Sequence, residues 1–313
     1  MRLANLVHPE LPDVGAVLLA HGHVMLPDLA AAAGRAWPAT LDALLDAGAL
    51  PELQAWLAEH PRRAADLPTA GSDRRPGPPL RRPPKILGVG LNYAEHAGDL
   101  GEERPDEPAT FMKPATTIVG PGDPVRLPPQ SARTTGEAEL GLVIGRHCRD
   151  LNEDEALDAV AAVVPIIDMT AEDILQRNPR FLTRAKSFDT FLAFGPHLVT
   201  LDDVSPRTER GPPEGRGPHA ARGPHAARGP LDALEVRTVL DGEVRRRNVV
   251  ANMRFSPARL VAFFSQVMTL EPGDVIATGT PGAVVLSHGT IVGCVIPGVG
   301  EIACPVVDEK RSG

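Results

Sequence analysis

The 313-residue chain has few cysteines, no long apolar segment and no basic tract interleaved with aromatic residues. Its three cysteines, Cys148, Cys294 and Cys304, are an odd number without metal-site spacing, so we expect a reducing compartment and no disulfide framework. The longest apolar run, residues 159–167, is far too short to span a bilayer. The net charge of −8 argues against nucleic acid as a partner. We therefore predict a soluble cytoplasmic protein.

Lysine is scarce as well. Only Lys85, Lys113, Lys186 and Lys310 occur, and arginine supplies the other 28 of the 32 basic residues. Because this chain uses arginine wherever a solvated positive charge suffices, a retained lysine can indicate a need for a compact ammonium group. Codon bias is the alternative explanation, and it is adequate for Lys310. We favour a functional role for Lys186 and for Lys113.

The length and the 42% hydrophobic content allow a substantial core and two unequal domains. Residues 1–66 are predicted to form a small N-terminal domain. We expect a hairpin from residues 14–19 and 23–26 there, followed by short helices at 41–45 and 50–57. Residues 67–84 are rich in proline, glycine and arginine and are predicted to be a surface linker. The larger domain, 85–313, carries all the candidate functional groups.

Residues 204–230 interrupt this larger domain with a low-complexity insertion. The sequence G-P-H-A-A-R occurs at 217–222 and again at 223–228. Such a segment cannot bury a core and is predicted to be a disordered surface loop, so we expect deletion of 208–228 to change activity and melting temperature little. Further along, residues 256–268 are predicted to form an amphipathic helix. The apolar face of that helix should consist of Leu260, Phe263, Phe264 and Val267.

The main candidate site begins with the run G-E-A-E-L-G-L-V-I-G at residues 136–145. Alternate strand residues share a face, so Glu137 and Glu139 point one way and the apolar residues between them point into a core. Two carboxylates on one face repel each other unless water or a cation separates them, and hard divalent cations take oxygen ligands. Asp168, after an apolar run, could supply a third carboxylate. The spacing alone also fits a solvated strand face.

A second candidate group follows the apolar strand at residues 85–90. His96 and Asp99 are three residues apart, so on a helical turn they share a face. A carboxylate beside a histidine orients the ring and favours its charged form, which suits a general base. A surface histidine near a surface aspartate is the alternative reading.

Taken together and in order, the motifs of residues 85–306 resemble the fumarylacetoacetate hydrolase family. The motifs are G-x-G-x-N-Y-x-x-H, F-x-K-P, G-P-G-D-P, E-x-E-L-x-x-V-I-G, D-M-T-A-x-D, R-A-K-S-F-D-T-F and L-E-P-G-D-V-I-x-T-G-T-P. The resemblance implies an α+β fold that is mainly β. It combines a mixed β-roll catalytic domain with a small N-terminal α/β domain, and it usually forms a homodimer.

The same resemblance implies a set of site residues. Glu137, Glu139 and Asp168 would hold Mg²⁺ or Mn²⁺, and His96, helped by Asp99, would activate water. In many relatives the acid at the position of Asp99 is glutamate. The resemblance implies that Lys186 holds or polarises the substrate carbonyl. Further substrate contacts are expected at Tyr93, Lys113, Arg184, Asp189, Gly279 and Thr280.

The substrate class that the resemblance implies is a small 2-oxo acid, often with a second carbonyl β to the first. We expect hydrolysis of the C–C bond of an acylpyruvate-like substrate through a metal-stabilised enolate. The same electron sink serves decarboxylation of an oxaloacetate-like acid and isomerisation of a hydroxymuconate-type diacid. A catalytically silent binding protein is the alternative of another class.

One position departs from the family pattern. Many relatives carry T-A-R-D after the metal aspartate, but this chain has Glu172 in place of the arginine. A carboxylate there would repel an anionic substrate group. Either Glu172 turns away and Arg177, Arg180 or Arg184 takes over the role, or the substrate lacks that group.

Overall fold

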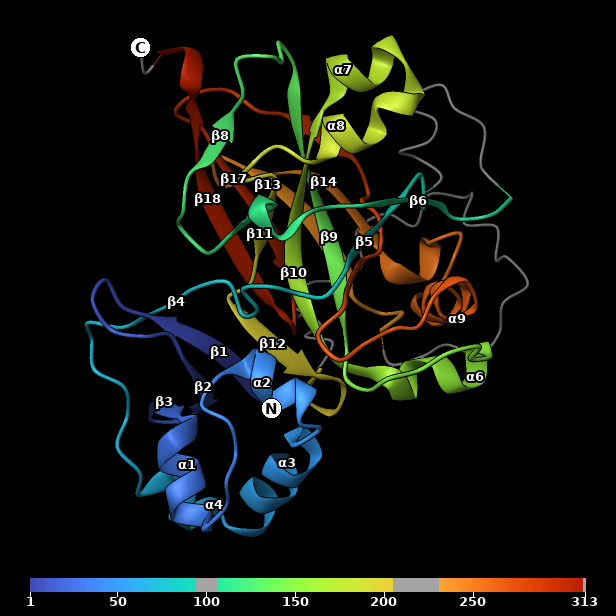
Figure 1. Ribbon diagram of the computed structural model, residues 1–313. Coiled ribbons are helices and arrows are strands. Elements are labelled where there is room, and N and C mark those ends of the chain that lie inside the picture. Colours follow the sequence, from blue (N-terminus) through green and yellow to red (C-terminus); the bar gives the residue numbers. More distant parts are fainter. Residues whose placement is uncertain (94–105, 205–230, 312–313) are drawn as a thin grey trace, which may run out of the picture.

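The computed structural model describes residues 1–93, 106–204 and 231–311 (Figure 1). The described strands form two sheets, one of 13 strands and one of five, so the predicted mainly β fold is confirmed. No helix in these ranges is long and apolar enough to cross a membrane. Most of the low-complexity insertion, residues 205–230, lies outside the described residues.

The large sheet has the main strand order β3-β2-β1-β12-β10-β9-β15-β5-β6. These strands are, in chain order, β1 (Arg2–Val7), β2 (Val14–Leu19), β3 (Gly22–Met25), β5 (Ile86–Gly90), β6 (Ala109–Met112), β9 (Thr134–Ile144), β10 (Val160–Ala171), β12 (His197–Thr200) and β15 (Val275–Ala277). Four short strands attach beside this path: β4 (Arg75–Pro76), β7 (Ile118–Val119), β11 (Leu192–Phe194) and β16 (Ala283–Val285). The long antiparallel pair β9 and β10 therefore lies in the middle of the sheet.

The second sheet packs against one face of this central pair (Figure 1). Its order is β14 (Glu243–Val249), β13 (Glu235–Leu240), β17 (Ile291–Ile296), β18 (Gly300–Asp308) and β8 (Val125–Leu127). Leu140 and Leu142 of β9 share one buried cluster with Val292 and Cys294 of β17. This packing makes one face of β9 and β10 the main core of the molecule.

The helices lie around these sheets. They are α1 (Leu26–Ala33), α2 (Leu41–Asp46), α3 (Leu50–Glu59), α4 (Pro61–Ala65), α6 (Glu153–Ala156), α7 (Glu172–Arg177), α8 (Leu182–Lys186) and α9 (Pro257–Val267). In α9 the Ser256 hydroxyl accepts a hydrogen bond from the Arg259 N–H, as an N-cap should. Leu260 and Phe264 are buried as predicted, but Val267 is 57% exposed. The prediction for Val267 was wrong because the buried face of α9 is formed by Leu260, Val261, Phe264 and Ser265, which leaves Val267 at the edge of that face.

The N-terminal residues continue the large sheet rather than forming a separate one. The predicted hairpin is present as β2 and β3, and the two predicted helices correspond to α2 and α3. Strand β1 pairs antiparallel with β12, with Leu3 opposite Leu198. The helices α1 to α4 cover this end of the sheet (Figure 1). Backbone hydrogen bonds thus join the first 66 residues to the domain that carries the site.

The proline-rich linker is only partly at the surface. Residues 77–80 are buried, and Leu80 is part of the core beneath the N-terminal strands. The Gly77 N–H donates to the Asn5 carbonyl, and a Cβ at Gly77 would lie 2.4 Å from a Val7 methyl group. The expectation of a surface linker was therefore wrong for this stretch, because glycine lets it approach β1 closely.

Candidate metal centre

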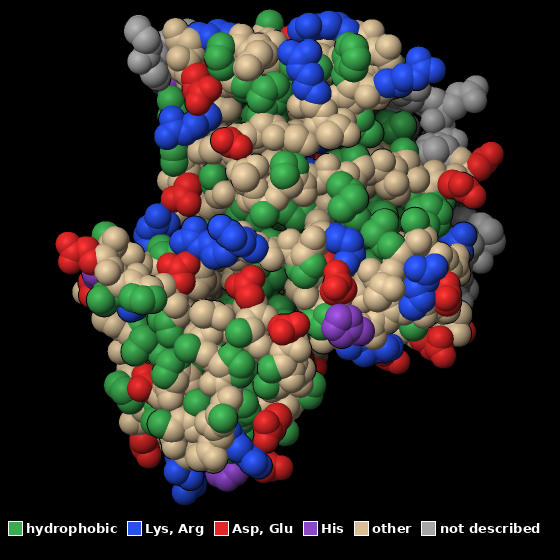
Figure 2. Space-filling view, viewed as in Figure 1, with side chains coloured by type: hydrophobic (Ala, Val, Ile, Leu, Met, Phe, Trp, Pro, Cys, Tyr) green, Lys and Arg blue, Asp and Glu red, His purple; other side chains and the backbone are tan. Residues whose placement is uncertain are grey.

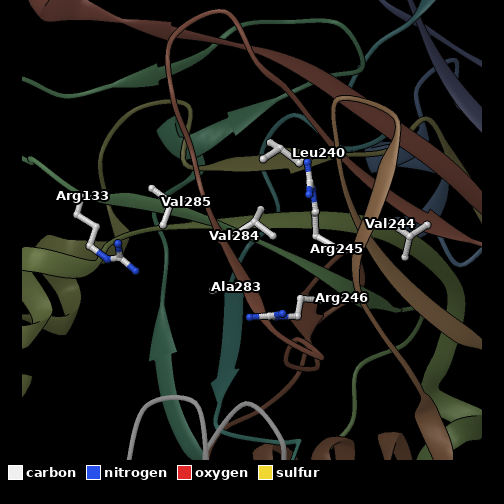
Figure 3. Close-up of a pocket in the computed structure, with 8 residues that line it drawn as sticks. All are labelled: Arg133, Leu240, Val244, Arg245, Arg246, Ala283, Val284 and Val285. Carbon is white, nitrogen blue, oxygen red and sulfur yellow. The ribbon is translucent and has the colours of Figure 1, made fainter.

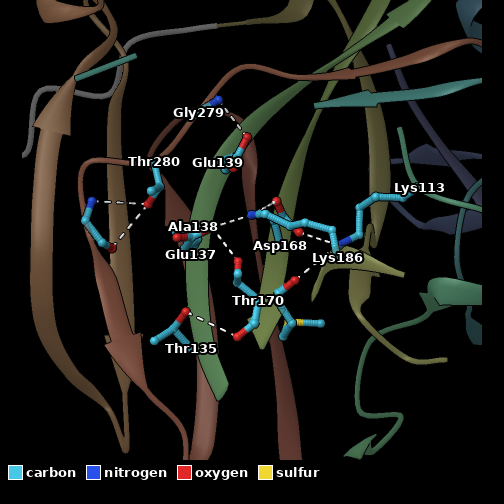
Figure 4. A network of polar contacts seen from close by, with 12 residues as sticks. Lys113, Thr135, Glu137, Ala138, Glu139, Asp168, Thr170, Lys186, Gly279 and Thr280 are labelled. Carbon is cyan, nitrogen blue, oxygen red and sulfur yellow. Dashed lines mark hydrogen bonds and ion pairs between the residues drawn. The ribbon is translucent and has the colours of Figure 1, made fainter. Parts of the chain in front are cut away.

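Three carboxylates converge on the face of β9 and β10 that is turned away from the second sheet (Figure 4). In the antiparallel register Glu137 lies opposite Asp168, and Glu139 lies opposite Ile166. Residues directly opposite each other share a face, so the alternation of β9 brings all three acids together. One carboxylate oxygen from each of the three acids lies within 4.8 Å of the other two. The trio is buried, with Asp168 fully so, and the alternative of a solvated strand face was wrong.

Two lysines contact these acids. Lys186, at the end of α8, donates to Glu137 Oε2 at 2.9 Å and to Asp168 Oδ2 at 2.6 Å. Lys113, just after β6, donates to Asp168 Oδ1 at 2.5 Å and to the Met169 carbonyl at 3.2 Å. Both oxygens of Asp168 are thus held, each by a different ammonium group.

Burial and these contacts shift the ionisation of the cluster. Burial alone would raise the pKa of Asp168, but Lys113 and Lys186 outweigh it and hold the pKa below its usual value. Burial lowers the pKa of Lys113 to about 8, although Asp168 opposes that shift. Burial also acts against the charge of Lys186, yet Asp168 and Glu137 together raise its pKa. The cluster therefore favours a carboxylate at Asp168 and an ammonium at Lys186.

Glu139 is the acid with the least positive charge around it. Its Oε2 accepts a hydrogen bond from the Gly279 N–H at 2.6 Å. Unlike Glu137 and Asp168, it forms no ion pair with Lys113 or Lys186. Burial and the nearby Asp168 and Glu137 raise its pKa well above the usual value. With all three acids ionised, three carboxylates and two ammonium groups give the cluster one negative charge in excess, and the raised pKa of Glu139 shows that this excess is disfavoured without a further cation. An all-oxygen donor set with this excess fits a hard divalent cation.

The loop after β15 supplies the remaining contacts near Glu139. Gly279 has a φ of +98°, and a Cβ there would lie 2.8 Å from the Asn92 Cβ. Glycine therefore lets the loop turn its N–H toward Glu139. The Asn92 amide fixes the loop from the other side by donating to the Thr278 carbonyl at 2.7 Å. Thr280, beside Gly279, exchanges hydrogen bonds with the backbone of Gly282.

The other predicted substrate contacts differ from one another in burial. Tyr93 is fully buried, and its hydroxyl has no hydrogen-bond partner within residues 1–93, 106–204 and 231–311. Burial, followed by the charge of Glu139, raises the pKa of that hydroxyl. Arg184 and Asp189 are exposed, on α8 and just beyond it, where basic side chains gather in Figure 2. His96 and Asp99 lie outside the described residues, so their predicted roles stay predictions.

The unusual Glu172 is paired with a residue that the sequence analysis did not consider. Arg133 donates from Nε to Glu172 Oε2 at 2.7 Å, and Gln176 donates to Glu172 Oε1 at 2.8 Å. Arg177 instead pairs with Asp173 at 3.3 Å. Arg133 immediately precedes β9, so its position in the chain was the available signal. Glu172 is therefore neutralised locally at the outer end of the polar face.

An open hollow of about 560 Å³ lies beside this outer end (Figure 3). It is lined by Arg133, Leu240, Val244, Arg245, Arg246, Ala283, Val284 and Val285. In β16, Ala283 is the register partner of Glu137. The hollow thus borders the strand next to the carboxylate trio, although none of the three acids lines it.

Comparison with known proteins bears on both the fold and the site. The family model for the C-terminal region of fumarylacetoacetate (FAA) hydrolase matches residues 85–307. An uncharacterised protein from Methanocaldococcus jannaschii is 36% identical over 230 residues, which are 73% of this chain and 85% of that protein.

Two solved structures resemble nearly the whole chain. The 5-carboxymethyl-2-hydroxymuconate delta-isomerase from Mycobacterium smegmatis is 28% identical, with a TM-score of 0.70 and coverage of 99% of both chains. Maleylpyruvate hydrolase from Sphingobium sp. SYK-6, solved with manganese(II) and pyruvate, is 26% identical. Its TM-score is 0.73, and the match covers 98% of this chain and 99% of that one.

Proposed function

Because this chain belongs to the fumarylacetoacetate hydrolase family, we propose that it is a divalent-metal-dependent hydrolase of a small acylpyruvate-like 2-oxo acid. The observation that carries the proposal is the buried trio Glu137, Glu139 and Asp168 with Lys186 beside it. These three acids would hold Mg²⁺ or Mn²⁺. The manganese in the solved maleylpyruvate hydrolase supports this choice of ion.

The reaction adds water across a C–C bond. When bound, the cation supplies a Lewis acid that stabilises enolate charge. His96, with Asp99, takes a proton from water, whose oxygen attacks the carbonyl carbon remote from the carboxylate. Lys186 stabilises the oxyanion that develops there. The C–C bond breaks, its electron pair stays on the pyruvate unit as an enolate, and a proton completes pyruvate.

The other residues of the site bind the substrate in this proposal. Thr280 and the backbone beside Gly279 hold the substrate carboxylate, and Tyr93 offers a buried hydroxyl that no described residue contacts by a hydrogen bond. Lys113, Arg184 and Asp189 were predicted as further substrate contacts. Of these, Lys113 contacts Asp168.

A spectrophotometric assay tests the proposal. Metal-stripped protein is mixed with a short acylpyruvate, whose enolised diketone absorbs in the ultraviolet, before and after addition of Mg²⁺ or Mn²⁺. We expect metal-dependent loss of absorbance, with pyruvate and a carboxylic acid as products, and no loss with Glu137→Ala. If metal binds but the absorbance stays, the site does not hydrolyse acylpyruvates. If no metal binds, a silent relative is favoured.

A hydroxymuconate-type isomerase is the second candidate. The resemblance to the mycobacterial delta-isomerase over 99% of both chains favours it about as much as the resemblance to the hydrolase favours hydrolysis. Isomerisation moves a proton and a double bond without adding water. Mass spectrometry of the product separates the two, because hydrolysis gives two fragments and isomerisation conserves the mass. Carbon dioxide release would indicate an oxo-acid decarboxylase instead.

We also propose that the protein works as a cytoplasmic homodimer. This assembly is usual in the family that the motifs resemble. Light scattering coupled to size-exclusion chromatography tests it, with an expected mass of twice the 33.2 kDa of one chain. A mass of one chain at micromolar concentration would contradict it.

A further inference from the structure

We propose that the two buried lysines have different tasks toward the cation that the proposed function requires. Lys186 occupies the place of that cation in the metal-free protein and moves away when the cation binds. Lys113 stays on Asp168 and positions it as a ligand. This inference rests on the proposed metal dependence, but it concerns only what the chain's own side chains do.

The contacts of Lys186 are the first reason. Its ammonium bridges Glu137 Oε2 and Asp168 Oδ2, so it links two of the three acids. A divalent cation that uses the same acids needs oxygens that this ammonium already holds. An ammonium and a cation repel each other when they share a pair of carboxylate oxygens. Lys186 therefore competes with the metal for Glu137 and Asp168.

The contacts of Lys113 are different in kind. It touches a single acid, at Asp168 Oδ1, and its second partner is the Met169 carbonyl of β10. That carbonyl belongs to a strand held in the sheet, and the Met169 N–H donates to the Phe191 carbonyl at 3.1 Å. A fixed backbone partner anchors Lys113 whether or not a cation binds. One oxygen of Asp168 stays held while the other can be released.

The surroundings also give Lys186 more freedom than Lys113. The Lys113 side chain is completely enclosed, whereas that of Lys186 is 8% exposed. Lys186 is the last residue of the five-residue helix α8, and the Phe111 ring lies 4.6 Å from its Nζ. An aromatic face stabilises an ammonium, and Phe111 lies nearer to Lys186 than Phe191 lies to Lys113, whose Nζ is 5.9 Å from that ring. Lys186 can therefore keep this aromatic contact when the carboxylates are taken. In Figure 4 the two lysines approach Asp168 from separate elements.

The proposal has a functional consequence. In the metal-free protein the Lys186 ammonium is occupied by two acids and is not available to a substrate oxygen. Release of Lys186 by the cation would let it stabilise the developing oxyanion. The ammonium then becomes available only in molecules that hold the metal.

Matched variants test the two tasks. Lys186→Met and Lys113→Met remove the same ammonium group from the same cluster, and isothermal titration calorimetry measures Mn²⁺ binding to metal-stripped protein. For Lys186→Met we expect a Kd below that of the wild type, because a competitor is gone. For Lys113→Met we expect a Kd raised about tenfold or more, as for other residues that orient metal ligands. Equal changes in both variants, or unchanged or weaker binding in Lys186→Met, would overturn the proposal.

A second measurement uses the wild type and does not depend on the variants folding. The chain has four lysines, so a ¹H–¹⁵N spectrum of lysine ammonium groups contains at most four signals. We expect saturating Mg²⁺ to shift or broaden the Lys186 signal and leave Lys113 in place. Lys85, which pairs with Glu271 and Asp274, serves as the internal control. A Lys186 signal unchanged at saturation would overturn the exchange.

The outcomes separate this inference from the proposed function. If the wild type binds neither Mg²⁺ nor Mn²⁺, the proposed metal dependence fails and the exchange fails with it. If the wild type binds the ion while Lys186 stays on Glu137 and Asp168, only the exchange fails. If Lys113 moves instead of Lys186, the two tasks are reversed and the proposal is wrong as stated.

Discussion

The two faces of the central pair β9 and β10 are both buried, but their chemistry differs. One face consists of apolar side chains, such as Leu140, Leu142 and Ile167, packed against the second sheet. The other face carries Glu137, Glu139 and Asp168 at the same depth. The same two strands thus place an ordinary core back to back with a cluster of buried charges.

This contrast separates stability from function. Burial of apolar area stabilises the fold roughly in proportion to that area. Burial of charge is costly unless partners compensate it, and replacement of a buried ion pair by apolar residues is often neutral or stabilising. The apolar face should therefore control the free energy of unfolding. The polar face should control metal binding and activity at little benefit to stability.

The largest expected effect is on the polar face. Glu139→Gln keeps the shape and can still accept the Gly279 N–H, but it removes a ligand charge. We expect the Kd for Mn²⁺ to rise at least about 100-fold, since even residues that only orient ligands cost 10 to 100-fold, and activity to fall with it. The melting temperature of the metal-free protein should stay the same or rise, because the pKa of Glu139 shows that its charge is disfavoured. Calorimetry and thermal denaturation check both effects. Unchanged metal affinity would remove Glu139 from the ligand set.

The matched change on the apolar face should have the opposite profile. Leu142 is fully buried and lies opposite Val163. Leu142→Ala should lower the free energy of unfolding by about 2 to 5 kcal/mol, because it leaves a cavity. The Kd for Mn²⁺ of the folded molecules should stay within about twofold of the wild type, within RT of no change. Denaturation in urea and calorimetry on one preparation measure both quantities. A large loss of metal affinity would show that the two faces are not independent.

Much of the polar face could be predicted from the sequence. The period-two alternation of β9 places Glu137 and Glu139 together whatever the rest of the fold, and the motif order supplied Asp168. The contact of Lys113 with Asp168 was not predicted, because it joins residues 55 positions apart through the tertiary fold. Likewise the pairing of Glu172 with Arg133 depends on the register that places the start of β9 beside the end of β10.

The failures in the fold have similar physical causes. Composition marks residues 77–80 as a loop, but it does not show that β1 leaves room for a close backbone contact at Gly77. Helical periodicity places Val267 beside Leu260 and Phe264, but it does not show which side of this apolar stripe the rest of the molecule covers. Local pattern predicts elements and faces, whereas contacts between distant segments require the assembled sheet.

A smaller effect should come from a half-buried polar contact between two histidines. His23 on β3 and His197 on β12 approach to 2.9 Å between their Nε2 atoms, with stacked rings. Burial, then His23 and Arg2, lowers the pKa of His197 to about 4. The unfolded chain therefore binds a proton near pH 6.5 that the folded protein rejects until about pH 4. Stability from this site is present above pH 6.5 and is lost as the pH falls toward 4.

The size of this loss and its control can be measured. We expect it to be about 1 to 3 kcal/mol between pH 7 and pH 4. His197→Gln should flatten that part of the pH dependence of unfolding, whereas His147→Gln, at an exposed position, should leave it unchanged. Equal slopes in the wild type and His197→Gln would show that this contact does not couple folding to protons. The half-buried histidine pair would then contribute less to the pH dependence of unfolding than its lowered pKa predicts.

The smallest effect is expected where the polar face reaches solvent. Arg133 and Glu172 pair at 2.7 Å, but the Arg133 side chain is half exposed, and exposed ion pairs contribute at most about 1 kcal/mol. A double-mutant cycle with Arg133→Ala and Glu172→Ala, read by urea denaturation, should give a coupling energy below that value. Mn²⁺ affinity should stay within about twofold of the wild type. A coupling above about 2 kcal/mol would show that this pair behaves like the buried charges. The polar face would then act as one unit along its whole length, including the end that reaches solvent.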